Sequence, residues 1–342
     1  MIREGIQAVV EGRNLTEAEA IAVMREIMEG SASPAQIAAF MVGLRMKGET
    51  VEEITGCARV MRDKATFIST PPGAIPVDTC GTGGDGAHTF NISTTAAFVA
   101  AGAGLVLAKH GNRAASSTCG SADLLEALGV NIGLESAGVE ASIREVGMGF
   151  LFAPALHGAM RHAIGPRREI GVRTVFNILG PLTNPARAQH QLVGVYDGNL
   201  TAVMATVLHN LGAKRAFVVH GSDGLDELTT TGVSTVSELR GGRVHTYTVH
   251  PGDFGLLSNR PEELRGGDAS CNADLTLRLL HGETLPQRGI VLLNAAAAIA
   301  AGTADKSIVD CLPLAQAALD SGQALAKLEH LREFTRQWSQ TS

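Results

Sequence analysis

The stretch Ser69-Thr70-Pro71-Pro72-Gly73 divides the chain into two parts with different patterning. Before it, three S/T-x-x-E/Q capping boxes and apolar residues at helical spacing predict four short helices. After it, strand and helix patterns alternate, which predicts a central, largely parallel sheet flanked by helices. We therefore expect an α/β protein with a small helical bundle over residues 1–70, joined by helices from about 156–177, and a larger domain over 71–342.

Composition narrows the class of protein. The chain has 342 residues, 45% of them hydrophobic and 18% charged, which indicates a large core and excludes disorder. The net charge of −6 argues against nucleic-acid binding. The five cysteines are spread without a C-x-x-C pair, which favours reduced thiols and a cytoplasmic location. We expect neither a signal peptide nor a membrane span, because no segment reaches about 18 uncharged apolar residues.

Local patterns predict where the larger domain forms its elements. Strands are expected at 75–78, 105–109, 149–153, 193–197 and 215–220, and a hairpin at 236–249 should turn at Gly241-Gly242. Ser121 should cap a helix over 122–128, and Asn199 should cap the helix after strand 193–197. Helices should return from about residue 268.

A glycine-rich loop runs from Asp78 to Thr95 and contains a G-x-G-x-x-G match that ends at Gly86. A dinucleotide site would need a helix that opens at that last glycine and an acidic residue at the end of the next strand. The helix signal instead begins near Ser93, and the next strand ends in Lys109-His110. The loop therefore favours a multiply phosphorylated ligand held by backbone N–H groups, with a glycine-rich structural turn as the alternative.

Two further loops should lie at the same edge of the sheet, because the carboxyl ends of parallel strands meet there. The first, Lys109 to Ser117, brings cations and hydroxyls, and the second, Asp223 to Glu227, brings adjacent carboxylates that suit Mg²⁺. Each has a simpler alternative, a solvated cation or an acidic turn. Together with the glycine-rich loop they favour a site for a phosphorylated substrate and metal.

Six ordered blocks resemble the anthranilate phosphoribosyltransferases of tryptophan synthesis. They are Gly81-Thr82-Gly83-Gly84-Asp85-Gly86, Thr89-Phe90-Asn91-Ile92-Ser93-Thr94, Lys109-His110-Gly111-Asn112-Arg113, Gly120-Ser121-Ala122-Asp123, the run from Arg173 to Pro185, and Asp223-Gly224-Leu225-Asp226-Glu227. The resemblance implies a nucleoside phosphorylase/phosphoribosyltransferase-like fold, a homodimer, and transfer of the phosphoribosyl group of phosphoribosyl pyrophosphate to anthranilate, with release of pyrophosphate.

The resemblance also implies three sets of site residues. Contacts to phosphoribosyl pyrophosphate fall on Gly81, Gly84, Asp85, Thr89, Asn91, Ile92, Ser93, Thr94, Lys109, His110, Gly111, Asn112, Arg113, Ala114, Ala115, Ser116, Ser117 and Ser121. Contacts to anthranilate fall on Gly81, His110, Asn112, Arg167 and Pro181. About two Mg²⁺ ions fall on Ser93, Asp226 and Glu227.

Roles follow from the implied reaction. No protein nucleophile is needed, and Lys109 should stabilise charge on the departing pyrophosphate. Arg167 suits the anthranilate carboxylate, although the adjacent Arg168 or a surface role is an alternative. His110 is either a positioning residue or a structural histidine. A pyrimidine nucleoside phosphorylase and a non-catalytic nucleic-acid-binding relative are the competing functions.

Overall fold

The computed structural model describes residues 1–114 and 118–341, and it begins with a helical bundle. Its helices are α1 (Ile2–Val10), α2 (Glu17–Met28), α3 (Pro34–Lys47) and α4 (Val51–Lys64). The three expected capping boxes form at Thr16, Ser33 and Thr50, where each hydroxyl accepts the N3 backbone N–H. The four-helix prediction is therefore confirmed.

A seven-stranded sheet forms the centre of the rest of the chain. Its strands are β1 (Pro76–Thr79), β2 (Val106–Gly111), β3 (Met148–Phe152), β4 (His190–Gly194), β5 (Arg215–Gly221), β6 (Ser234–Arg240) and β7 (Arg243–Val249). Their order is β3-β2-β1-β4-β5-β6-β7, and the first five are parallel. The hairpin β6–β7 is antiparallel and turns at Gly241 and Gly242, both with positive φ, as the sequence predicts.

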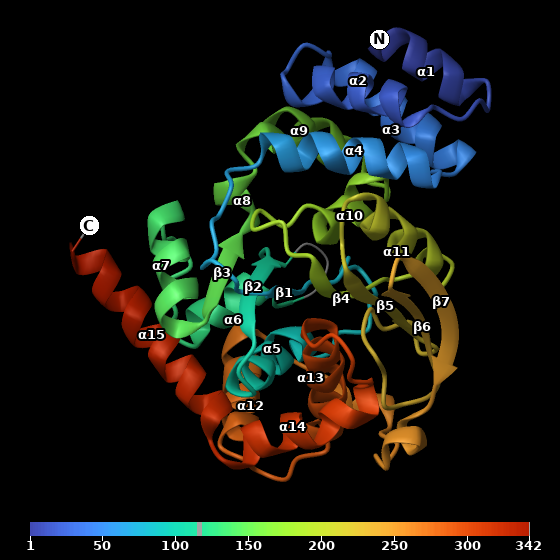
Figure 1. Ribbon diagram of the computed structural model, residues 1–342. Coiled ribbons are helices and arrows are strands. Elements are labelled where there is room, and N and C mark those ends of the chain that lie inside the picture. The colour runs from blue at the N-terminus through green and yellow to red at the C-terminus, as the bar shows by residue number, and fades with distance from the viewer. Residues whose placement is uncertain (115–117, 342) are drawn as a thin grey trace.

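Helices cover both faces of this sheet (Figure 1). On one face, α5 (Ile92–Gly102) and α13 (Arg288–Gly302) pack against β1, and Leu192 and Phe217 join their core. On the other face, α11 (Leu200–Asn210) packs against β5, and the alternate residues Val193 and Val218 join a second core. The remaining α-helices are α6 (Ser121–Ala127), α7 (Ser136–Val146), α8 (Ala153–Leu156), α9 (Arg161–Ile170), α10 (Phe176–Leu179), α12 (Ala269–Leu280), α14 (Ile308–Asp320) and α15 (Gln323–Thr341).

The helical bundle shares the second core with one face of the sheet. Residues of α2, α3 and α4 belong to the same buried cluster as α10, α11, β4 and β5. Helix α9 packs against α3 and α2, so the segment after β3 returns to the bundle. Figure 1 shows α9 beside α1–α4 at one end of the molecule. None of the helices in the described ranges is both long and apolar enough to cross a membrane.

Three local expectations differ from the structure. The strand expected at 193–197 ends at Gly194, because the backbone N–H of Tyr196 turns to the Thr82 hydroxyl. Asn199 lies at the N-cap of α11 without a side-chain cap, and the Asp197 carboxylate instead accepts the Asn199 N–H. Helix α6 begins at Ser121 itself, so Ser121 is not its cap.

The first turn of α6 is fixed by a carboxylate instead. The carboxylate of Asp123 accepts the backbone N–H groups of Gly120 and Ala114. An ionised acceptor near a helix N-terminus is stabilised by the helix dipole, which a hydroxyl cap is not. This carboxylate ties the loop after β2 to the helix that follows it.

We predict that Glu53→Ala destabilises the protein by about 3–5 kcal/mol. Glu53 and Lys47 form a 2.9 Å ion pair whose side chains are 0% and 5% exposed, and Glu53 also accepts the N–H of Leu15 at 2.8 Å. Removing the carboxylate leaves the Lys47 charge buried without its ion partner. The free energy of unfolding in urea, followed by circular dichroism, measures the effect. The adjacent exposed Glu52→Ala is the control, and equal losses in both variants would contradict the prediction.

Candidate active site

The loops that follow β1 and β5 meet at the carboxyl ends of the parallel strands. The Asp226 carboxylate accepts the backbone N–H of Gly83 at 2.7 Å, although the two residues are 143 positions apart. A Cβ on Gly81 would overlap that carboxylate, and a Cβ on Gly194 would overlap the Asp226 carbonyl oxygen. Glycine is therefore required at both positions for the acidic turn to pack against the glycine-rich loop.

The neighbouring Glu227 reaches the start of α5. Its carboxylate accepts the backbone N–H of Ser93 at 3.1 Å and also bonds the Ser93 side chain. Burial raises the pKa of both Asp226 and Glu227; the Asp85 carboxylate adds to the rise for Asp226, and the Asp226 and Asp85 carboxylates add to it for Glu227. Among the described residues, no cation lies within 4.0 Å of either carboxylate.

These three residues form a set of hard oxygen donors. Carboxylate and hydroxyl oxygens are the ligands that Mg²⁺ prefers. Both carboxylates are buried with no cation of the described residues within 4.0 Å, and a bound divalent cation would offset their charge. Ser93, Asp226 and Glu227 therefore fit a magnesium site in both chemistry and charge.

The two cations expected in a loop from Lys109 to Ser117 are already engaged, and Lys109 lies within strand β2 itself, which runs on to Gly111. The ammonium of Lys109, which is 2% exposed, donates to the carbonyl of Thr79 at 2.6 Å and to its hydroxyl at 3.2 Å. Its charge counteracts the rise in pKa of Asp226 and Glu227. Arg113 is exposed and forms ion pairs with Asp123 and Glu126. The Lys109 charge thus favours the ionised form of the acidic residues without an ion pair to them, whereas the charge of Arg113 is matched by its own carboxylates.

A pair of buried histidines lies beside this loop. His110 Nδ1 is 3.2 Å from the carbonyl oxygen of Gly180, and its Nε2 is 3.2 Å from Nε2 of His157. Because a carbonyl only accepts, His110 carries its proton on Nδ1, and His157 must donate through Nε2. Burial lowers the pKa of His110 to about 3 and that of His157 to about 4, so both rings are neutral near pH 7. His110 is therefore unsuited to hold a proton for catalysis.

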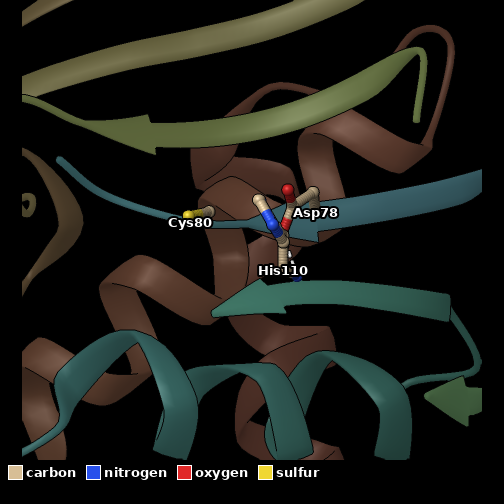
Figure 2. Close-up of side chains that lie close together, drawn as sticks. All are labelled: Asp78, Cys80 and His110. Carbon is tan, nitrogen blue, oxygen red and sulfur yellow. Dashed lines mark hydrogen bonds between the residues drawn. The ribbon is translucent and has the colours of Figure 1, made fainter. Parts of the chain in front are cut away.

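Asp78, Cys80 and His110 bring ligand atoms within 4.8 Å of one another (Figure 2). The two Asp78 oxygens already accept the backbone N–H of His110 at 3.0 Å and the Asn184 amide at 2.7 Å. Both ring nitrogens of His110 are also engaged, with Gly180 and His157. A metal here would displace bonds already formed, so this group is a hydrogen-bonded joint between β1, β2 and the segment at Asn184.

The other predicted residues around the glycine-rich loop lie as follows. Ile92 and Thr94 are buried in the first turn of α5. The Asn91 amide donates to the carbonyl of Cys119 and accepts from Asn272, so it is tied to the neighbouring elements. Thr89 forms an isolated bridge with Arg265.

In the loop after β2, the Ser121 hydroxyl donates to the carbonyl of Asn112 at 3.2 Å. A Cβ on Gly111 would overlap that hydroxyl, so the close approach needs glycine. Ala114 is bound to Asp123 through its backbone N–H. The predicted residues Ala115, Ser116 and Ser117 lie outside the described residues.

Two of the predicted anthranilate residues, Arg167 and Pro181, come from a different part of the chain. Arg167, on α9, is partly buried, and its guanidinium lies 5.3 Å from the centre of the Phe176 ring. Burial lowers the pKa of Arg167, whereas Arg168 is exposed. Pro181 is buried in a short 3-10 helix, and its carbonyl accepts from the Gln191 amide at 2.9 Å.

Sequence reasoning gave no role to two residues that the structure places at this site. His157 bonds His110 although 47 positions separate them, and Gly194 provides the space for Asp226. Each looks ordinary in the sequence, since a lone histidine or a glycine after a strand is common. Only their contacts across the fold reveal them.

Comparison with known proteins decides the family. Residues 3–65 match the helical bundle domain of the glycosyl transferase family, and residues 73–325 match its a/b domain. A protein of Acetivibrio thermocellus, named anthranilate phosphoribosyltransferase, is 54% identical over 98% of this chain and 97% of its own length. The chain belongs to the anthranilate phosphoribosyltransferase family. As a member of this family it is an enzyme of the transferase class.

Solved structures of the anthranilate phosphoribosyltransferase family agree with the fold. The enzyme of Thermus thermophilus superposes with a TM-score of 0.92 at 44% identity, covering 97% of this chain and 99% of the other. The Saccharomyces cerevisiae enzyme, solved in complex with PRPP and Mg, has a TM-score of 0.88 at 26% identity and covers 98% of each chain. The expected fold class is therefore confirmed.

We predict that the metal-free protein loses stability as the pH rises, in part through Asp226 and Glu227. Because folding raises the pKa of both, their contribution is fully present below the normal carboxylate pKa and is lost as the pH passes through the raised values. Thermal unfolding between about pH 5 and about pH 9 should show a smaller loss in the Asp226→Asn/Glu227→Gln variant. Mg²⁺ should restabilise only the wild type at the higher pH.

The control for this measurement is Glu262→Gln, which removes an exposed carboxylate and should keep the wild-type pH dependence. Identical pH profiles for the wild type and the double variant would contradict the buried, repelling pair.

Proposed function

We propose that this chain transfers the phosphoribosyl group of phosphoribosyl pyrophosphate to the amine of anthranilate, as in tryptophan biosynthesis. The observation that supports this most directly is the contact between the acidic turn at Asp226 and the glycine-rich loop at Gly83. It joins carboxylates that suit a metal to backbone N–H groups that suit phosphate. The relatives' names support the same reaction, and the yeast enzyme has been solved with PRPP and Mg and with 4-fluoroanthranilate.

In the proposed reaction the amine attacks C1 of the ribose and pyrophosphate departs. Ser93, Asp226 and Glu227 would hold magnesium, which supplies positive charge against the developing charge on the pyrophosphate. The N–H groups of the loop, among them those of Gly84 and Asp85, would bind phosphate oxygens, and Gly84 puts no side chain in the way. Lys109 adds a buried positive charge that favours the ionised form of Asp226 and Glu227. We propose about two ions, whose coordination the substrate oxygens would complete.

No protein base is needed to activate the nucleophile, because an aromatic amine is neutral at physiological pH. This agrees with the low pKa of His110, about 3, which excludes the ring as a proton carrier there. Its bonds to Gly180 and His157 instead fix the orientation of the imidazole. We assign His110 a positioning role beside anthranilate, together with Gly81, Asn112 and Pro181.

We assign the anthranilate carboxylate to Arg167 rather than Arg168. Arg167 is the partly buried member of the pair and stacks on Phe176, while Arg168 is exposed. A guanidinium in a desolvated setting binds a carboxylate in bidentate fashion more strongly than one in water does.

We predict that Arg167→Ala raises the KM for anthranilate by about 10- to 100-fold and changes the KM for phosphoribosyl pyrophosphate little. The physical reason is loss of a charge-assisted, bidentate hydrogen bond to one substrate only. Steady-state kinetics with each substrate varied in turn provide the measurement. Arg168→Ala is the matched control, and the assignment is wrong if that variant shows the larger effect.

Further proposals concern the domains, the oligomeric state, the location and the partners of the enzyme. We infer two domains, over residues 1–70 and 71–342, with helices from about 156–177 packed on the first. We also propose a homodimer and a cytoplasmic location, with small-molecule substrates and neither nucleic acid nor membrane as partner. The net charge of −6 supports the absence of a nucleic-acid partner.

A fluorescence assay of anthranilate consumption tests the reaction itself. We expect turnover that requires both phosphoribosyl pyrophosphate and Mg²⁺, and a strong loss in the Asp226→Ala/Glu227→Ala variant because the metal loses its ligands. An unchanged magnesium titration in that variant would overturn the metal assignment. Phosphorolysis of thymidine in the absence of anthranilate turnover would favour the nucleoside phosphorylase alternative.

A further inference from the structure

Arg173 carries a guanidinium directly onto the glycine-rich loop. Its Nη2 donates to the carbonyl oxygen of Gly84. A Cβ built on Gly84 would lie 3.5 Å from Nη2, 3.8 Å from Cζ and 3.9 Å from Nε, so the guanidinium covers the α-carbon of this residue. Cζ also lies 4.2 Å from the centre of the Tyr196 ring. The charged group therefore contacts both the loop and an aromatic ring.

The Tyr196 segment and the glycine-rich loop, which Arg173 contacts, are hydrogen-bonded to each other, and the loop is also bonded to the end of β4. Tyr196 donates its backbone N–H to the Thr82 hydroxyl at 3.1 Å, and Thr82 donates its own to the Gly194 carbonyl at 2.9 Å. Next to Arg173, Thr174 is 4% exposed and donates its N–H to the Asn177 side chain at 3.0 Å. Stacking and anchoring together restrict where the guanidinium can move.

The charge of Arg173 is unmatched in the free protein. No carboxylate of the described residues lies within 4.0 Å of its guanidinium, and the side chain is exposed. By contrast, Arg113 pairs with two carboxylates, and Lys109 is buried against Thr79. A guanidinium carries several N–H donors, and the single hydrogen bond to Gly84 leaves the other N–H groups available to an anion.

We propose that Arg173 is a further substrate-binding residue, which binds a phosphate group of phosphoribosyl pyrophosphate at the glycine-rich loop. The inference rests on the proposed function. It adds Arg173 to the substrate residues that the family resemblance implies. A planar guanidinium matches the geometry of phosphate oxygens in bidentate fashion. It also supplies positive charge where the substrate meets Asp85, Asp226 and Glu227, whose own charges repel phosphate.

A purely structural role is the alternative, because the bond to Gly84 could simply hold the loop in place. The two roles need different chemistry. Holding a neutral carbonyl requires only an N–H donor, which Gln also has. Binding a phosphate depends on charge, which Lys keeps and Gln lacks.

The test compares Arg173→Gln, Arg173→Lys and Arg173→Met with the wild type. Calorimetry measures the Kd for pyrophosphate with Mg²⁺, which does not depend on turnover, and kinetics measure the KM for each substrate. We expect Gln and Met to raise the Kd for pyrophosphate and the KM for phosphoribosyl pyrophosphate by about 10- to 100-fold. Lys should recover part of the loss, and the KM for anthranilate should change by less than about threefold.

Arg161→Met, which removes an exposed arginine of α9, is the matched control and should bind pyrophosphate like the wild type. The proposal would be overturned if Arg173→Gln bound pyrophosphate as tightly as Arg173→Lys does. It would also be overturned if the Kd for pyrophosphate of Arg173→Met stayed within about twofold of the wild-type value. Thermal unfolding of each variant without ligand checks that the fold is intact. Failure of the wild type itself to consume anthranilate would instead contradict the proposed function, so the two failures are distinguishable.

Discussion

The turn that carries Asp226 and Glu227 is packed between the end of β4 and the glycine-rich loop, and the geometry of the site depends on this packing. The Asp226 carbonyl lies against Gly194, and its carboxylate bonds the N–H of Gly83. A side chain at Gly194 or at Gly81 would push the turn away from the loop. The carboxyl ends of β1, β4 and β5 therefore act as one rigid support for the loop and for the acidic residues.

The second constraint is the negative charge of the acidic turn, which the packing described above buries. Placing Asp226 and Glu227 together in a buried position near Asp85 raises the pKa of both. Lys109 offsets part of this, and Arg173 brings another positive group to the loop. A site with this balance favours a ligand that brings its own divalent cation together with phosphate oxygens. Magnesium with a pyrophosphate group meets that requirement.

Hydrogen bonds and a shared core hold the helical bundle against the sheet, on either side of the site. Arg62 of α4 donates to the carbonyl oxygens of Leu182 and Leu211, which lie in the larger part of the chain. Helix α9 carries Arg167 and packs on α3, so the proposed anthranilate residue belongs to the bundle side. The proposed phosphate residues belong to the sheet side. With these proposed roles, the reaction would require the two sides to be correctly placed relative to each other, and the shared core joins them.

The sequence by itself determined the elements and the kind of chemistry. Capping boxes, hydrophobic periodicity and the Gly241-Gly242 turn are local signals, so the bundle, the parallel sheet and the hairpin were all predictable. Predictions from local sequence were wrong where a hydrogen bond to another residue replaced the expected one. The strand at Val193 stops early because Thr82 captures the N–H of Tyr196, and the Asp123 carboxylate takes the place of a Ser121 cap.

Only the tertiary structure decided how the site residues share their charges and hydrogen bonds. The sequence placed Lys109 and Arg113 together as cations, but the fold buries one against Thr79 and pairs the other with two carboxylates. It also brought His157 to His110 and Arg173 to Gly84. The physical reason is that such contacts join segments tens of residues apart, and their energies depend on burial and distance, which no local pattern encodes.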